Sequence, residues 1–152
     1  MEHADITQRI IGCAMKVHQT LGSGFLESVY QNALAHELRK CGLRVECKKP
    51  LEVTYDGVVV GNFETDMLVQ ECVLIENKAV QALVAAHEVQ LVNYLTATGI
   101  DIGLLLNFGA HKLEFKRKHR IYRPTTGKSI SGQDERIGSD ANGTSIRITS
   151  FP

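Results

Sequence analysis

The chain lacks the cysteine spacing of a zinc site: no Cys-x-x-Cys pair occurs, and no histidine cluster accompanies its four cysteines, Cys13, Cys41, Cys47 and Cys72. This pattern excludes the usual structural zinc motifs and fits reduced thiols in a cytoplasm. The start of the chain lacks a basic stretch followed by an apolar one, so we expect no signal peptide. No apolar run approaches the ~20 residues of a membrane span, so we expect no membrane partner. The formal net charge is zero, which gives no overall signal for nucleic acid.

Positive charge is nevertheless concentrated in one segment. Residues 112–123 contain 6 Lys or Arg and a single Glu, whereas residues 1–111 contain 8 Lys or Arg and 13 Asp or Glu. A basic segment on an acidic body fits a strip that faces phosphates. It fits equally an edge strand protected by lysines. The sequence leaves both interpretations open.

Length and periodicity predict one α/β domain with a mixed sheet. Apolar residues recur at helical spacing in three segments, which are residues 5–22, the stretch from the glycine-rich segment at 22–24 to Lys40, and residues 83–98. Between the second and third helices, alternating segments around an Asp56-Gly57 turn predict an antiparallel meander, with Pro50 breaking its first strand. The apolar run at residues 102–108 predicts a strand covered on both faces. It would lie parallel to the strand before the third helix and complete one β-α-β unit.

Composition changes after residue 123. Residues 124–152 are rich in Thr, Gly, Ser, Asp and Asn and contain few apolar residues. We therefore expect a folded domain over residues 1–123, followed by a disordered polar tail over residues 124–152.

Carboxylates gather in residues 63–79, which predict two short strands around a turn at residues 70–72. Side chains alternate along a strand, so Glu76 and Lys78 share a face. With a three-residue loop Asp66 lies directly opposite Glu76, and like charges in that position are destabilising. A hard divalent cation would explain the pair. On spacing alone, however, a solvated charge cluster on an exposed hairpin is the favoured interpretation.

Further polar residues lie on helix faces that carry apolar residues. Glu27 is in angular register with Leu34 and Leu38 at about 100° per residue. Glu27 has two possible roles. It is an acid in the first helical turn, where it interacts with the helix dipole or completes a capping box from Gly24, or it is a third carboxylate directed at the sheet. On the third helix Gln90 and Tyr94 share a face, which fits an ordinary tyrosine half-buried against the sheet.

Taken together, these motifs resemble a known family. Residues 24–30, Gly-Phe-Leu-Glu-Ser-Val-Tyr, are similar to the motif that names the GxxExxY proteins, a compact branch of the PD-(D/E)XK nuclease superfamily. The resemblance covers residues 5–123, and the motif residues appear in the family's order: Glu27, Asp66, Glu76-Asn77-Lys78, Gln90 and Tyr94.

Two positions depart from the family pattern. Asn77 stands where the family more often has an apolar residue, although this position faces away from the site. Glu64 stands where many relatives carry a basic residue, which adds negative charge beside Asp66. Neither departure removes a motif residue.

The resemblance implies a restriction-endonuclease-like core and a divalent-metal-dependent nuclease that hydrolyses phosphodiester bonds of nucleic acid, with DNA favoured over RNA. Its cofactor would be Mg²⁺ or Mn²⁺. The implied metal ligands are Glu27, Asp66, Glu76 and the backbone carbonyl of Asn77. The implied catalytic residues are Asp66, Glu76, Lys78, Gln90 and Tyr94.

Two other functions remain open at this point. The same scaffold could be a catalytically idle module that binds nucleic acid or a protein partner. It could also be a purely structural partner-binding domain, which would bind no metal. The sequence does not decide between endo- and exonuclease action, nor does it give the oligomeric state.

Overall fold

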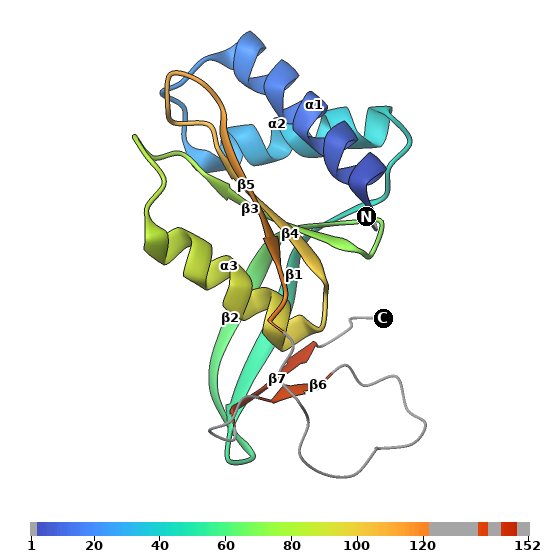
Figure 1. The fold of residues 1–152 in the computed structure, drawn as a ribbon, viewed down its shortest axis with the longest axis vertical. Coiled ribbons are helices and arrows are strands. Elements are labelled where there is room, and N and C mark those ends of the chain that lie inside the picture. Colours follow the sequence, from blue (N-terminus) through green and yellow to red (C-terminus); the bar gives the residue numbers. More distant parts are fainter. Residues whose placement is uncertain (1–2, 122–136, 140–143, 149–152) are drawn as a thin grey trace.

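A mixed β-sheet runs through the protein, with two helices on one face and a third on the other (Figure 1). The computed structural model describes residues 3–121, 137–139 and 144–148. In chain order the elements are α1 (Ala4–Leu21), α2 (Glu27–Lys40), β1 (Val45–Tyr55), β2 (Val58–Val69), β3 (Val73–Lys78), α3 (Ala85–Thr98), β4 (Ile102–Asn107), β5 (Glu114–His119), β6 (Ile137–Ser139) and β7 (Thr144–Ile148).

The strand order in the sheet is β5-β4-β3-β2-β1-β7-β6. The five strands from β5 to β1 form the mixed sheet between the helices, and β7 and β6 extend its β1 edge. Only the β3–β4 pair is parallel among the described strands, with α3 connecting them, while the other neighbours are antiparallel. The predicted α/β class is therefore confirmed, with its antiparallel meander and its β-α-β unit.

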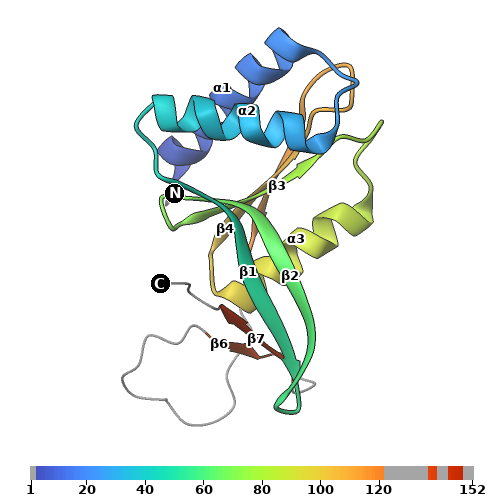
Figure 2. The same ribbon diagram turned by 180° about the vertical axis from the view of Figure 1, so that it is seen from behind.

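Alternation along the central strands builds two cores. Met67, Ile75 and Leu104 are fully buried in the cluster formed with α1 and α2, whereas their neighbours Leu74 and Leu105 are buried in the cluster formed with α3. Every residue of β4 is buried, as expected for a strand covered on both faces. Seen from behind, α1 and α2 lie together on their face of the sheet (Figure 2).

The first hairpin is one long, continuous pair of strands. Asp56 and Gly57 have φ of 52° and 77°, which suits the tight turn that the Asp-Gly pair predicts. Our expectation that Pro50 breaks the first strand is wrong, because β1 continues through it and pairs it with Glu64. In the described part of the chain β7 pairs with β1 only from Leu51 onward, so Pro50 lies where β1 is still an edge strand, a position that tolerates a missing N–H.

Two segments of the predicted tail, residues 137–139 and 144–148, are described in the structure. Within residues 124–152 the structure describes two short strands, of which β7 pairs with β1 and β6 pairs with β7. The other residues of that range lie outside the described residues. No helix in the described part of the chain is long and apolar enough to cross a membrane.

Candidate active site

Asp66 and Glu76 face each other where β2 and β3 begin to separate. The paired residues are Val69 with Val73, Leu68 with Leu74, and Met67 with Ile75, and the same register continued by one step joins Asp66 to Glu76. The loop at residues 70–72 is therefore three residues long, as predicted. Asp66 is two residues from Leu68 and Glu76 is two residues from Leu74, both members of the α3 cluster, so the two acids lie on the α3 face of the sheet.

Burial and mutual repulsion raise the pKa of Glu76 to about 8. Burial is the largest cause, the negative charge of Asp66 raises the pKa further, and the charge of Lys78 opposes both. The Oε1 atom of Glu76 is buried and has no hydrogen-bond partner among the described residues. An acceptor left without a partner in the interior is costly, so this oxygen is suited to a ligand that supplies positive charge.

Asp66 is held in place by the backbone of the next strand. Its Oδ2 accepts a hydrogen bond of 2.7 Å from the N–H of Asn77. Burial raises the pKa of Asp66, while this hydrogen bond and the charge of Lys78 lower it. The carboxylate is thereby oriented without help from a bound cation.

Glu27 lies within electrostatic reach of this pair. It is the first residue of α2 and is exposed, yet burial and the charge of Asp66 raise its pKa, while Lys78 lowers it. The charge of Glu27 in turn raises the pKa of Glu76. The N-cap of α2 is Leu26, so the capping box from Gly24 is not formed. The charge of Glu27 therefore acts on the sheet acids, and Glu27 also lies in the first turn, where the helix dipole favours an acid.

A buried tyrosine fixes the segment that leads into Glu27. The hydroxyl of Tyr30 donates to the carbonyl of Gly22 at 2.6 Å and accepts the N–H of Phe25 at 3.1 Å. Its ring stacks on Phe108 with centroids 4.9 Å apart. From the sequence, Tyr30 was identified only as the last residue of the motif at residues 24–30 and was given no role of its own. The signal that could have found its role is its place in the motif, one helical turn after Glu27.

A chain of polar contacts connects Lys78 to α3. The Nζ of Lys78 donates to Oε1 of Gln90 at 3.4 Å, and Nε2 of Gln90 donates to the hydroxyl of Tyr94 at 2.9 Å. The ring of Tyr94 stacks on Phe63 at 4.3 Å. Burial raises the pKa of Tyr94, and the charges of Glu76 and Asp66 add to the rise, which places this hydroxyl near both acids.

Asn107 organises the chain just after Lys78 and was missed by sequence reasoning. It is buried and pairs with Lys78 across the parallel strands. Its Oδ1 accepts the N–H groups of Val80 and Gly109, and its Nδ2 donates to the carbonyl of Val80 and to Glu114. A polar residue closing the apolar run of β4 was the available signal.

The side chains of Asn77 and His87 make contacts that support the fold. The side chain of Asn77 points to the α1 and α2 face, where Nδ2 contacts the sulfur of Met67 at 3.3 Å. Only the backbone of Asn77 is therefore available on the acid side. His87 accepts the N–H of Val84 through Nδ1 at 3.2 Å and so caps the start of α3.

The donors present suit a hard cation held by few protein ligands. Among the described residues, no three His, Cys, Asp or Glu side chains form a ready metal-binding group. Mg²⁺ is usually bound by one or two carboxylates and keeps several waters, so it does not need a closed protein cage. The paired carboxylates and the unpartnered Oε1 of Glu76 therefore fit such an ion.

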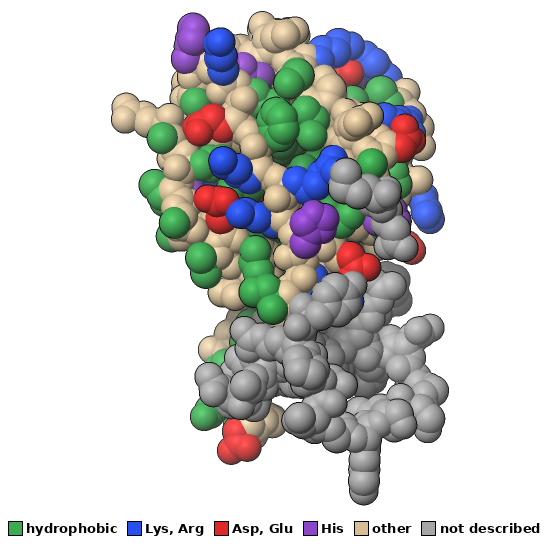
Figure 3. Space-filling view, viewed as in Figure 1, with side chains coloured by type: hydrophobic (Ala, Val, Ile, Leu, Met, Phe, Trp, Pro, Cys, Tyr) green, Lys and Arg blue, Asp and Glu red, His purple; other side chains and the backbone are tan. Residues whose placement is uncertain are grey.

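The basic segment is partly neutralised by acids of the same domain. Lys118 forms an ion pair of 2.5 Å with Glu88, and Arg120 forms one of 2.9 Å with Asp101. Acidic and basic side chains are interspersed on the face seen in Figure 3. The far end of the segment, residues 122–123, lies outside the described residues.

The chain was compared with family models, with curated protein sequences and with solved structures. A family model described as PD-(D/E)XK nuclease superfamily matches residues 4–118. No curated protein sequence matches the chain. The crystal structure of SSO0001 resembles this fold with a TM-score of 0.48 and 15% sequence identity, covering 63% of this chain and 50% of that one. The likeness thus spans about half the length of that protein.

Proposed function

The chain belongs to the PD-(D/E)XK nuclease superfamily, and we propose that it is a divalent-metal-dependent nuclease that hydrolyses phosphodiester bonds of nucleic acid. One observation carries the proposal: Asp66 and Glu76 face each other beside Lys78, with a buried oxygen of Glu76 that no described residue satisfies. In an ion-pair cluster with a purely structural role, each carboxylate would have a cationic or hydrogen-bonding partner within the cluster. This group instead leaves an excess of negative charge at the sheet.

The proposed cofactor is Mg²⁺ or Mn²⁺. Asp66 and Glu76 would hold it, with the backbone carbonyl of Asn77 as a further ligand and Glu27 binding directly or through water. Such an ion makes a bound water more acidic and stabilises charge on the phosphate. The orphaned oxygen of Glu76 and the repulsion between the carboxylates support this ligand set.

The other motif residues act around the scissile phosphate. Lys78 would orient the attacking water or stabilise charge that develops on the phosphate, because lysine is a donor and not a ligand for this ion. Gln90 and Tyr94 would position the water or the substrate backbone. Their contacts support this role, since Gln90 bridges Lys78 and the Tyr94 hydroxyl.

The finer assignment is to the GxxExxY branch, with DNA favoured over RNA as the substrate and a cytoplasmic location. The branch assignment is supported by the order of the motif residues and by the way Tyr30 holds the segment before Glu27. A cytoplasmic location fits the four cysteines, which are free thiols in the structure.

The proposal is tested by cleavage and metal binding measured on the same samples. Wild-type protein is incubated with circular and linear DNA and with RNA, in the presence of Mg²⁺, Mn²⁺ or chelator, and its melting temperature is recorded with each ion. We expect metal-dependent cleavage and a metal-dependent rise in Tm. Wild-type protein that shows neither on any substrate would instead be the idle binding module on the same fold.

A further inference from the structure

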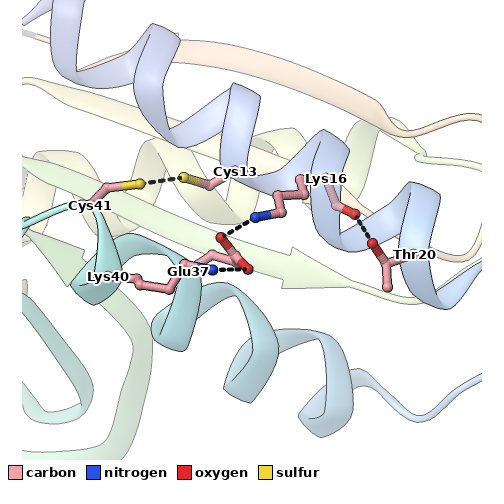
Figure 4. A network of polar contacts seen from close by, with 6 residues as sticks. All are labelled: Cys13, Lys16, Thr20, Glu37, Lys40 and Cys41. Carbon is pink, nitrogen blue, oxygen red and sulfur yellow. Dashed lines mark hydrogen bonds and ion pairs between the residues drawn. The ribbon is translucent and has the colours of Figure 1, made fainter.

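Two thiols face each other at the contact between α1 and α2, away from the site described above. The Sγ atoms of Cys13 and Cys41 are 3.8 Å apart, and the two side chains point toward one another (Figure 4). Cys13 lies on the buried stripe of α1, whereas Cys41 is exposed and caps the C-terminus of α2. Cys41 is thus at the opposite end of α2 from Glu27.

Polar contacts on both sides of the thiols hold the two helices together. Glu37 of α2 accepts Lys16 of α1 at 3.2 Å and Lys40 at 3.4 Å (Figure 4). Arg9 of α1 donates to the backbone carbonyl of Cys41 at 2.8 Å. These contacts lie on either side of the two sulfur atoms, so the packing of α1 against α2 holds the sulfurs close together.

We propose that Cys13 and Cys41 form a modification site that reacts with hydroperoxides and joins α1 to α2 by a disulfide bond. The proposal does not rest on the proposed nuclease function, because it uses none of its residues. The sulfurs need to close from 3.8 Å to the ~2.05 Å of a disulfide, a movement of less than ~2 Å.

Exposure assigns different roles to the two thiols. Cys41 is open to solvent, so its thiolate attacks a peroxide oxygen, forming a sulfenic acid and releasing water or an alcohol. The sulfur of Cys13 then attacks the Cys41 sulfur, the S–S bond forms, and the hydroxyl leaves as water with the Cys13 proton. In total, two thiols and one hydrogen peroxide give one disulfide and two waters. Burial and the contact with Cys41 raise the pKa of Cys13 to about 11, which disfavours its thiolate, so the exposed Cys41 is the thiol that reacts first.

The cross-link would enclose the segment that positions Glu27. Cys13 and Cys41 are 28 residues apart, and residues 22–27 lie between them. Closing a loop of this length restricts the unfolded chain, and we expect Tm to rise by about 10 °C for a domain of this size.

The test uses the full chain with Cys47→Ser, which removes the other exposed thiol. The reduced protein is treated with hydrogen peroxide and examined by intact mass, peptide mapping and thermal melting. We expect the loss of two hydrogen atoms, a peptide that links Cys13 to Cys41, and a Tm rise that dithiothreitol reverses. Cys41→Ser should abolish all three effects, whereas Cys72→Ser in the same background should abolish none.

Two results would overturn the proposal. One is oxygen added at Cys41 without a cross-link, which would leave the Cys13–Cys41 contact as a thiol hydrogen bond only. The other is a disulfide that joins separate molecules. Because Cys41 is exposed, the Cys41→Ser variant should fold, and the Tm of its reduced form checks this.

Discussion

The Oδ2 of Asp66 accepts the backbone N–H of Asn77 at 2.7 Å, just beyond the last paired residues of β2 and β3, Met67 and Ile75. A side chain has thus taken a backbone donor of the neighbouring strand. One oxygen of Asp66 is fixed by this bond, so the carboxylate faces Glu76 whether or not a cation is present. The repulsion between the two acids is therefore a property of the folded protein itself.

Relief of this repulsion predicts the behaviour of Glu76→Gln. The variant removes a buried acid that burial and Asp66 disfavour, so the metal-free protein should become more stable at neutral pH, by on the order of a few kcal/mol. It should also lose the rise in Tm caused by Mg²⁺. Thermal melting with and without Mg²⁺ measures both effects. Glu52→Gln on β1 is the matched control and should keep the metal response; equal responses in the two variants would remove Glu76 from the site.

The pH dependence of stability should fall in a defined window. The pKa of Glu76 is raised in the folded state to about 8, so its contribution to stability is fully present below its unfolded value near ~4.5 and is lost as pH rises through about 8. The raised pKa values of Asp66 and Glu27 act in the same direction. Denaturant melts of the metal-free protein from acidic to mildly basic pH should show this decline. Saturating Mg²⁺ and the Glu76→Gln variant should each flatten it.

Lys78→Ala should separate metal binding from cleavage. Lysine stabilises charge on the substrate, so its loss should lower the cleavage rate by ~10²–10³. The Mg²⁺-dependent rise in Tm should remain. Lys49→Ala on β1, where Lys49 pairs with Glu46, is the control and should cleave normally. A Lys78→Ala variant that cleaves at the wild-type rate would show that this lysine takes no part in the reaction.

Tyr30→Phe should weaken metal binding through Glu27. The substitution keeps the stack on Phe108 but removes the hydroxyl that holds Gly22 and Phe25, at a cost of ~1 kcal/mol of stability. If Tyr30 acts by positioning Glu27, Tyr30→Phe should reduce Mg²⁺ affinity several-fold in the wild type and have no further effect in a Glu27→Gln background.

Calorimetric titration of the four proteins in this cycle gives the coupling. Tyr55→Phe, at an exposed position of β1, serves as the control. Additive effects of Tyr30→Phe and Glu27→Gln would assign Tyr30 to general stability.

The basic segment should contribute unevenly to nucleic-acid affinity. Lys118 and Arg120 already pair with Glu88 and Asp101, whereas Lys112 and Lys116 are exposed. Replacing Lys112 and Lys116 by Ala should reduce the log–log salt slope of binding by roughly one unit per lost contact. Replacing Lys118 should change the slope less. Equal slopes for all these variants would assign the segment to protection of the β5 edge.

The relative placement of the acids could be derived from the sequence because it depends on simple periodicities. A two-residue alternation and a three-residue loop place Asp66 opposite Glu76. For Glu27 the helical repeat left a dipole or capping role and a sheet-directed role equally open. The Asp56-Gly57 turn was equally predictable, since few residue pairs accept two positive φ angles in succession.

Other features depend on partners that are distant in sequence. Pro50 was expected to end its strand, but whether a missing N–H matters depends on where β7 pairs with β1. The role of Asn107 depends on the fold of Val80 and Gly109 around it. Local patterns contain neither fact, so these residues could be assigned only from the structure.

The three-residue turn between β2 and β3 also determines how the site responds to a change in the length of the chain. Residues 70–72 set the register of the two strands, with Gln70 and Glu71 at φ of 52° and 56°. Inserting or deleting a single residue there would turn one acid to the opposite face, because side chains alternate. A change of two residues would restore the original face. The parity of this turn's length therefore decides whether the two acids meet on one face of the sheet.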